Sequence, residues 1–143
     1  MSTSGHTNGI CLGDKIRWIV KGLSELEPFF RNLSRLLADS AAVVYLEGVS
    51  ISPGIRGFLE LHSIAAWHEV VGGTIWPKPL IFHLPATSEV LSGLADLASR
   101  HSCPEEITDH CHVYTRDRMI LQWYDACDAG CPIGVGHTVP EIA

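Results

Sequence analysis

The sequence predicts an α/β fold, bordering on α+β, in which about three helices pack on a single mixed sheet of five to six strands. Three observations predict it. The length of 143 residues is typical of one domain. Apolar segments with strand and helix periodicity alternate along the chain. Two strand-like segments then follow one another near the C-terminus, as in a β-hairpin. The expected order is β-α-β-α-β-α followed by that C-terminal hairpin.

Composition limits the classes of function. Hydrophobic residues make up 46% of the chain and charged residues 18%, which is too apolar for a disordered protein. The 10 basic and 16 acidic residues give a net charge of −6, so we expect no nucleic-acid partner. No apolar run approaches the ~20 residues that span a bilayer, and no secretory signal is recognisable. We therefore expect a soluble cytoplasmic protein with no membrane association.

The first half of the chain predicts two strands and two helices. Residues 1–13 are expected to be a flexible tail, and residues 14–143 the single domain. The alternation over 15–20 indicates a strand, and an apolar stripe over 24–37 indicates a helix. That helix is capped by Ser24 or begins with Pro28 at its first position. The continuous apolar run over 41–46 favours a central parallel strand, and Ser52 and Pro53 begin a second helix.

The second half predicts a third helix and the closing strands. Residues 65–71 are expected to form an edge strand and 80–84 a further strand. Thr87 or Ser88 caps a helix that ends near Arg100. Segments 110–115 and 119–124 form the hairpin, and 133–135 a last strand. Strand–helix–strand connections imply right-handed parallel crossovers in the first part of the sheet.

A polar cluster in the hairpin is the first candidate site. The hairpin brings Asp109 and His110 close to Asp125, and His110 and His112 share one face of their strand. Two imidazoles on one face suit zinc or another divalent metal, with Asp125 or a cysteine completing the ligands. Cys127 and Cys131 are the candidate cysteines. The alternative is that the histidines bond to backbone or water and the cysteines are reduced, buried filler.

Glu47 marks a second candidate site. It ends the most apolar strand, and ligands of open α/β sheets bind beyond the carboxyl ends of parallel strands. Glu47, Ser50, His83 and Thr87 are candidates by that position. Glu47 is then a general base or part of a site for a small anionic ligand. Alternatively, its carboxylate accepts backbone N–H bonds and holds the following loop.

Tryptophans suggest a surface for protein contact. Trp67 and Trp76 flank a glycine-containing segment, and Pro77 and Pro79 stiffen the second tryptophan. Tryptophan is enriched in interface hot spots, so these four residues are candidate contact residues. The alternative is that both rings cover one end of the core. The high apolar content also predicts an exposed apolar patch, and hence a homodimer or a protein partner.

Three functions follow from these features. The first is a small accessory domain that acts through binding or self-association, with no cofactor and no catalysis. The second is a small metal-assisted hydrolase that uses Asp109, His110, His112 and Asp125. The third is a sensor of a small anionic ligand near Glu47. No sequence pattern of a nucleotide-binding loop or nucleophile elbow is present to favour a particular enzyme class.

Overall fold

A six-stranded sheet forms the centre of the fold, and three α-helices pack against it. The computed structural model describes residues 16–20, 25–37, 41–70, 74, 76–100, 104–125 and 133–136, with positions 16–20, 104 and 136 described by their backbone only. In chain order the elements are β1 (Ile16–Val20), α1 (Leu26–Leu36), β2 (Val43–Gly48), α2 (Pro53–His62), β3 (Leu80–Pro85), α3 (Ser88–Ser99), a 3-10 helix (Pro104–Glu106), β4 (His110–Tyr114), β5 (Met119–Trp123) and β6 (Ile133–Gly136). The predicted fold class is confirmed.

Strand direction differs from the expectation. The strands lie in the order β1-β6-β5-β4-β2-β3, and every neighbouring pair is antiparallel. The predicted parallel crossovers are therefore wrong, although the C-terminal hairpin of β4 and β5 is confirmed. The continuous apolar run in β2 reflects a strand that is covered on both faces, since all six of its residues are buried. Burial on both faces does not require parallel neighbours.

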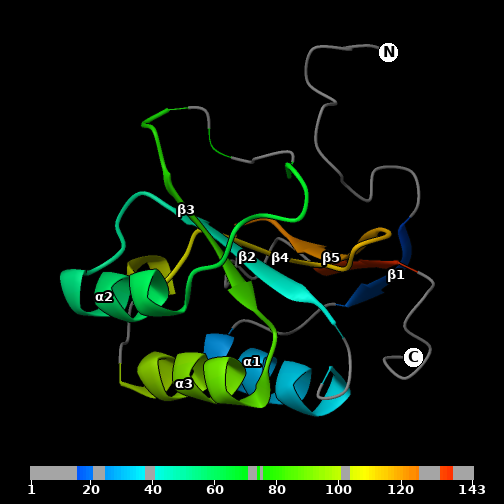
Figure 1. Ribbon diagram of the computed structural model, residues 1–143, viewed down its shortest axis with the longest axis horizontal. Coiled ribbons are helices and arrows are strands. Elements are labelled where there is room, and N and C mark those ends of the chain that lie inside the picture. The colour runs from blue at the N-terminus through cyan, green and yellow to red at the C-terminus, as the bar shows by residue number, and fades with distance from the viewer. Residues whose placement is uncertain are drawn as a thin grey trace.

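The main core lies between the sheet and the helices. Figure 1 shows the three helices on one side of the sheet, with α1 and α3 side by side. Inward-facing strand residues such as Leu46, Val113 and Leu121 join apolar residues of all three helices in one cluster. The rings of Phe29 and Trp123 lie 4.7 Å apart and join α1 to β5. Burial of this face supplies most of the apolar area that stabilises the domain.

The opposite face of the sheet is covered by an irregular segment. The described residues between α2 and β3, namely 63–70, 74 and 76–79, lie on this side in Figure 1 as a loop. Ile64, Trp67 and Val70 pack against a second, smaller cluster that includes Tyr45 and Tyr114. The predicted edge strand over 65–71 is therefore wrong for its described residues. The three packed residues are spaced three apart, which does not fit the period of two of a strand.

Helix starts agree in part with their predictions. Ser52 occupies the N-cap of α2 with Pro53 as first residue, and the Thr87 hydroxyl caps α3 by accepting the Val90 N–H at 3.2 Å. Helix α1 instead begins at Leu26 with Glu25 as N-cap, so Pro28 is its third residue. A proline is tolerated there because the first four N–H groups of a helix have no intrahelical partner. Ser24 and the expected tail over 1–13 lie outside the described residues.

No helix in the described ranges combines the length and apolar character that a bilayer crossing requires.

Candidate functional site

Six polar or aromatic side chains form an array on the sheet face that points away from the helices. Tyr45 and Glu47 lie on β2, and His110 and His112 lie on β4. Gln122 lies on β5, and Tyr124 directly follows that strand. We call this set the polar array. In the strand register, Tyr45 lies opposite His112, Glu47 opposite His110, and His112 opposite Gln122. Residues two apart on a strand share a face, so two rows of three side chains result.

His112 lies at the centre of the polar array and is fully buried, with 0% exposure. The Tyr45 ring stacks on it with centroids 5.3 Å apart and planes 2° apart, and the Tyr124 ring meets it edge-on at 4.8 Å. Its Nδ1 accepts a hydrogen bond from the backbone N–H of Trp123 at 3.3 Å. Its Nε2 is buried and has no hydrogen-bond partner among the described residues.

Burial also decides the charge of His112. Desolvation lowers the pKa of the ring to about 4, so it is neutral at neutral pH. A neutral imidazole carries one hydrogen, and a nitrogen that accepts a hydrogen bond does not carry it. The bond that Nδ1 accepts from the Trp123 backbone N–H favours the tautomer with its hydrogen on Nε2. His112 therefore presents a buried, uncharged N–H donor.

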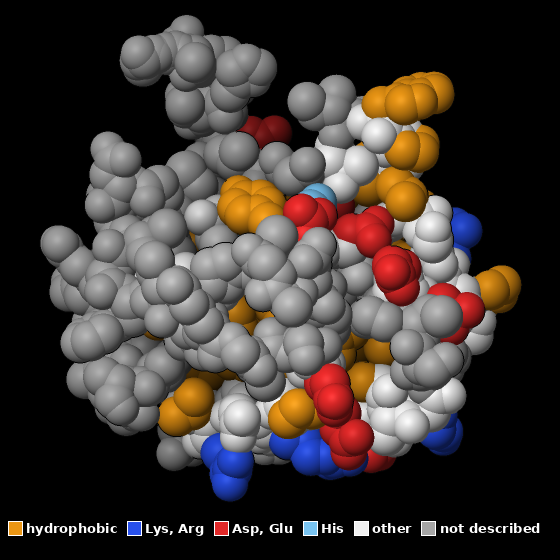
Figure 2. Space-filling view, turned by 180° about the vertical axis from the view of Figure 1, so that it is seen from behind, with side chains coloured by type: hydrophobic (Ala, Val, Ile, Leu, Met, Phe, Trp, Pro, Cys, Tyr) orange, Lys and Arg blue, Asp and Glu red, His pale blue; other side chains and the backbone are white. Residues whose placement is uncertain are grey.

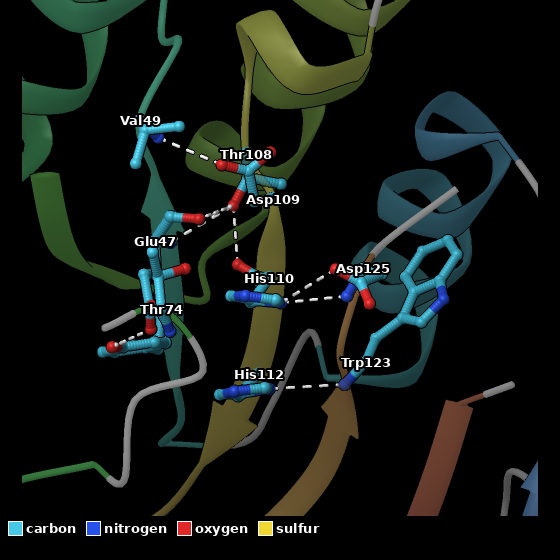
Figure 3. Close-up of polar contacts among 10 residues, drawn as sticks. Glu47, Val49, Thr74, Thr108, Asp109, His110, His112, Trp123 and Asp125 are labelled. Atoms are coloured by element: carbon cyan, nitrogen blue, oxygen red, sulfur yellow. Dashed lines mark hydrogen bonds and ion pairs between the residues drawn. The ribbon is translucent and has the colours of Figure 1, made fainter. Parts of the chain in front are cut away.

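His110 is held in the same way. Its Nδ1 accepts the Asp125 N–H at 2.9 Å, and the Asp125 carboxylate lies 4.0 Å from that nitrogen. The Thr108 hydroxyl donates to the His110 carbonyl at 2.6 Å. The predicted approach of His110 to Asp125 is thus confirmed as geometry. Figure 3 shows both histidine rings along β4, extending to the same side, with both bonds arriving from β5 and the residues after it.

The arrangement of the rings bears on the metal hypothesis. A histidine that binds metal through one nitrogen normally donates from the other to a carbonyl or carboxylate. Here both Nδ1 atoms accept N–H bonds instead, so neither Nε2 offers a lone pair in the neutral ring. The described part of the chain holds no group of three or more potential ligands that could hold a metal ion. Cys127 and Cys131 lie outside the described residues.

Asp109 binds the end of β2 and the turn that follows it through two hydrogen bonds. Its carboxylate accepts the Val49 N–H at 3.0 Å, and its own N–H donates to the Glu47 carbonyl at 2.9 Å. It therefore fixes the turn after β2. Figure 3 shows this contact at the end of the strands, beyond His110.

Glu47 is a fully buried carboxylate within the polar array, with 0% exposure. One oxygen accepts the Tyr45 hydroxyl at 2.6 Å, and the other accepts the Thr74 N–H at 2.6 Å. Acceptance by both oxygens is the behaviour of the ionised form. Burial, and then the bond to Glu47, raises the pKa of Tyr45 well above its ordinary value. The contact with Thr74 agrees with the interpretation that Glu47 holds a loop, although that loop follows α2 rather than β2.

The other residues expected beside Glu47 do not gather at one rim with it. Because β2 and β3 are antiparallel, Glu47 lies opposite Ile81, while Thr87 follows the other end of the strand pair. The expected common rim is therefore wrong. Thr87 caps α3, His83 shares a 2.8 Å hydrogen bond with the Tyr114 hydroxyl, and Ser50 is exposed in the turn after β2.

The candidate contact residues separate into two environments. Trp67 is half-buried against the sheet, and its backbone N–H donates to the Tyr114 hydroxyl at 3.1 Å. The Arg116 guanidinium lies 4.2 Å from the centroid of the Trp67 ring. The Trp67 ring therefore covers part of the sheet face that carries Tyr45 and Tyr114. Trp76 is 86% exposed and is followed by the exposed Pro77 and the half-buried Pro79. Figure 2 shows hydrophobic side chains gathered at the corner of the molecule where this segment lies.

Sequence reasoning missed Tyr45, Gln122 and Tyr124. The available signal was spacing, since Tyr45 lies two residues before Glu47 and must share its face. Gln122 is a polar residue inside an apolar strand segment, which also indicated a polar patch on one face. Neither signal specifies which strand lies beside which.

No family model matches this chain, and neither the curated proteins nor the solved structures gave a significant match.

Proposed function

We propose that the protein is a small-molecule binding domain and that the polar array is its binding site. The observation that carries the proposal is the buried, unpaired Nε2–H of His112. An unsatisfied buried donor costs about 1–3 kcal/mol, and native proteins contain few of them. A ligand that accepts this hydrogen bond removes the cost on binding. Of the functions expected from the sequence, this one is nearest to the small-ligand sensor.

The same geometry favours binding over proton transfer. A general base needs a lone pair that faces the substrate, and the His112 lone pair at Nδ1 is engaged by the Trp123 N–H. The Glu47 carboxylate is engaged by the Tyr45 hydroxyl and the Thr74 N–H. The ring of His112 can therefore donate a hydrogen bond without changing its protonation state. That is the property of a recognition group.

A fragment screen by NMR tests the proposal. Protein labelled with nitrogen-15 at histidine is mixed with uncharged, anionic and cationic ring compounds, and the His112 side-chain signals are followed. Binding is expected to shift them and to be lost in His112→Phe, which keeps a ring but removes the donor. His62→Phe is the matched control, because His62 lies at the end of α2 beside Phe58. If no compound of any charge shifts His112, the proposal fails.

We propose self-association through the Trp76 loop as a second function. The specific observation is the 86% exposure of Trp76 together with the 50% exposure of Ile81 at the start of β3. Exposed tryptophan is costly in water and is a frequent interface anchor. Sedimentation velocity over a concentration series is expected to show a dimer that Trp76→Ser disrupts. A monomer at all concentrations contradicts this second function.

A further inference from the structure

We infer that the contact between His83 and Tyr114 is a pH-sensitive latch for residues 63–70, the segment that follows α2. The latch holds this segment on the sheet while His83 is neutral and releases it when His83 is protonated. The inference depends on the hydrogen bonds at one phenol oxygen. It goes beyond the proposed binding function and does not require it.

Tyr114 is the point at which the segment is attached. Its side chain is fully buried, with 0% exposure. The backbone N–H of Trp67 donates to its hydroxyl oxygen at 3.1 Å, and Nδ1 of His83 lies 2.8 Å from the same oxygen. Burial raises the pKa of Tyr114, whereas hydrogen bonds from the backbone N–H groups of Trp67 and His68 lower it. Two backbone donors of the segment therefore point to this oxygen.

The neutral form of His83 completes this arrangement. A phenol hydroxyl has one hydrogen to donate, and its oxygen has two lone pairs that accept. Since both lone pairs of Tyr114 face backbone N–H groups, the network favours donation of the hydroxyl hydrogen to Nδ1 of His83. That nitrogen accepts only while it carries no proton. Burial lowers the pKa of His83, which favours its neutral form at neutral pH.

Protonation reverses the direction of the bond between the two rings. Both nitrogens of a charged imidazole are donors, so the His83 Nδ1–H becomes a third donor at the Tyr114 oxygen, and the hydroxyl hydrogen loses its acceptor. His83 and Tyr114 are fixed in strands, so the bond from Trp67 is the one expected to break. The Ile64 N–H still donates to the His83 carbonyl at 2.8 Å, and the segment opens beyond that point.

The other ionisable groups on this face of the sheet do not replace His83 as the titrating group. The Tyr45 ring meets His83 edge-on at 5.3 Å, but its hydroxyl donates to Glu47. Glu47 itself lies opposite Ile81, one residue pair along β3 from the pair that His83 forms in register with Tyr45 on this face. His112 lies on the other side of Tyr45 and becomes charged only near pH 4.

The ionisable groups of the segment do not oppose the latch. His68 contacts the Tyr114 ring, and its Nε2 lies 2.6 Å from the Arg116 carbonyl. A carbonyl only accepts, so Nε2 donates, and a charged His68 keeps this bond. The Arg116 guanidinium lies over the Trp67 ring, and Glu69 is exposed. Because Trp67 packs against the cluster that includes Tyr45, release of the segment uncovers that part of the sheet.

Hydrogen exchange at the Trp67 amide tests the latch. Protection factors, which correct for the intrinsic exchange rate, are measured by NMR at pH 7 and pH 5. Proton linkage allows the opening constant to rise by at most about tenfold per pH unit below the ordinary histidine pKa of 6.5. We expect Trp67 protection to fall by about three- to tenfold over this range. At both pH values it is expected to stay below the protection of Val113 in β4, which marks the opening as local.

Two variants identify the group that titrates. His83→Asn keeps a neutral acceptor near the position of Nδ1, so Trp67 protection is expected to lose its pH dependence. Tyr114→Phe removes the hydroxyl, so protection at pH 7 is expected to be as low as in the unmodified protein at pH 5. His62→Asn is the matched control and is expected to keep the pH dependence, because His62 lies on α2 beside Phe58.

Three results would overturn the inference. The first is equal Trp67 protection at pH 7 and pH 5 in the unmodified protein. The second is protection equal to that of Val113, which would mean that the segment opens only with the whole sheet. The third is an unchanged pH dependence in His83→Asn or, if that variant does not fold, in Tyr114→Phe. None of these results affects the fragment screen at His112, so the two proposals are tested separately.

Discussion

His112 illustrates how one side chain can be held firmly and still have an unused group. The strand pairing, the Tyr45 stack and the Trp123 N–H fix the ring on three sides. The same contacts determine which nitrogen carries the hydrogen. The structure therefore commits His112 to a neutral form with a donor that points away from its fixed side.

The free energy of unfolding is expected to decrease as the pH is lowered, because His112 is buried in its neutral form. The His112 pKa is about 4 in the folded chain and near its ordinary value of 6.5 when unfolded. Between these values the unfolded chain binds more protons, so the free energy of unfolding decreases as pH falls from about 6.5 to about 4. The loss is on the order of 3 kcal/mol. Urea denaturation at a series of pH values measures it.

The variant His112→Phe isolates this contribution. Burial also lowers the pKa of His83, so part of the pH dependence remains in the variant. The difference between the two proteins is expected to shrink as pH falls through this window. An unchanged pH profile in His112→Phe would show that His112 is not buried in its neutral form.

Glu47 is expected to stabilise the cover of the polar array. Glu47→Gln keeps only one acceptor oxygen for the Tyr45 hydroxyl and the Thr74 N–H, so one buried donor loses its charged partner. We expect a loss of about 1–3 kcal/mol in the free energy of unfolding. Hydrogen exchange at the Thr74 amide is expected to accelerate.

Glu60→Gln is the matched control for Glu47→Gln. Its carboxylate forms an exposed pair with Arg56 on α2, and such pairs contribute at most about 1 kcal/mol. Equal effects of the two substitutions on stability would contradict the role assigned to Glu47.

Individual residues were predictable from sequence where the contact is local. The pairing of His110 with Asp125 follows from any hairpin around residues 115–118, and the Thr87 cap follows from the helix pattern. The stacking of Tyr45 on His112 was not predictable, because it depends on β2 lying beside β4. These strands are more than 60 residues apart in the chain.

At the scale of elements, the approach of α2 to α3 is set by a glycine. A Cβ built on Gly93 of α3 would lie 2.6 Å from the Phe58 ring of α2. Gly57, on α2 itself, has no heavy atom within 4 Å of such a Cβ. A side chain at position 93 would therefore clash with the Phe58 ring, whereas a side chain at position 57 would meet open space.

Alanine substitution is expected to affect these glycines in opposite directions. Gly57→Ala gains helix propensity without a clash, so we expect stabilisation of about 0.5–1 kcal/mol. Gly93→Ala must displace the Phe58 ring, and we expect net destabilisation of about 1–3 kcal/mol. Thermal and urea unfolding of the two variants measure both effects.

The background Phe58→Leu provides the control. A shorter side chain at position 58 removes the ring atoms that meet the new methyl group, so Gly93→Ala is expected to cost less there than in the unmodified protein. The same cost in both backgrounds would mean that helix packing is not limited by this contact.

Element type was largely predictable, and strand direction was not. Periodicity predicted the hairpin and the three helices, because each pattern repeats within a single element. Antiparallel pairing of β2 with both β3 and β4 depends on which face α2 and α3 cover. A helix between two strands is typical of a parallel crossover, whereas α2 here joins two adjacent antiparallel strands.

At the scale of the whole molecule, the two faces of the sheet have different roles. One face is filled by helices and aliphatic side chains, and the other carries a charged carboxylate, two imidazoles and phenol rings under an irregular segment. A layer of apolar residues on both faces would stabilise the fold more simply.

Substitution in the exposed loop that carries Trp76 is expected to leave the free energy of unfolding nearly unchanged. Trp76 is 86% exposed, so Trp76→Ser removes little buried area and is expected to change the free energy of unfolding by less than about 0.5 kcal/mol at low protein concentration. Chemical denaturation measures it. A larger loss would place the Trp76 ring within the folded core.

The protonation state of His112 tests the account most directly. Long-range proton–nitrogen NMR of histidine-labelled protein reports which ring nitrogen carries the hydrogen and at what pH the ring becomes charged. We predict hydrogen on Nε2 and a neutral ring until the pH approaches about 4. Hydrogen on Nδ1, or an ordinary titration near 6.5, would contradict it.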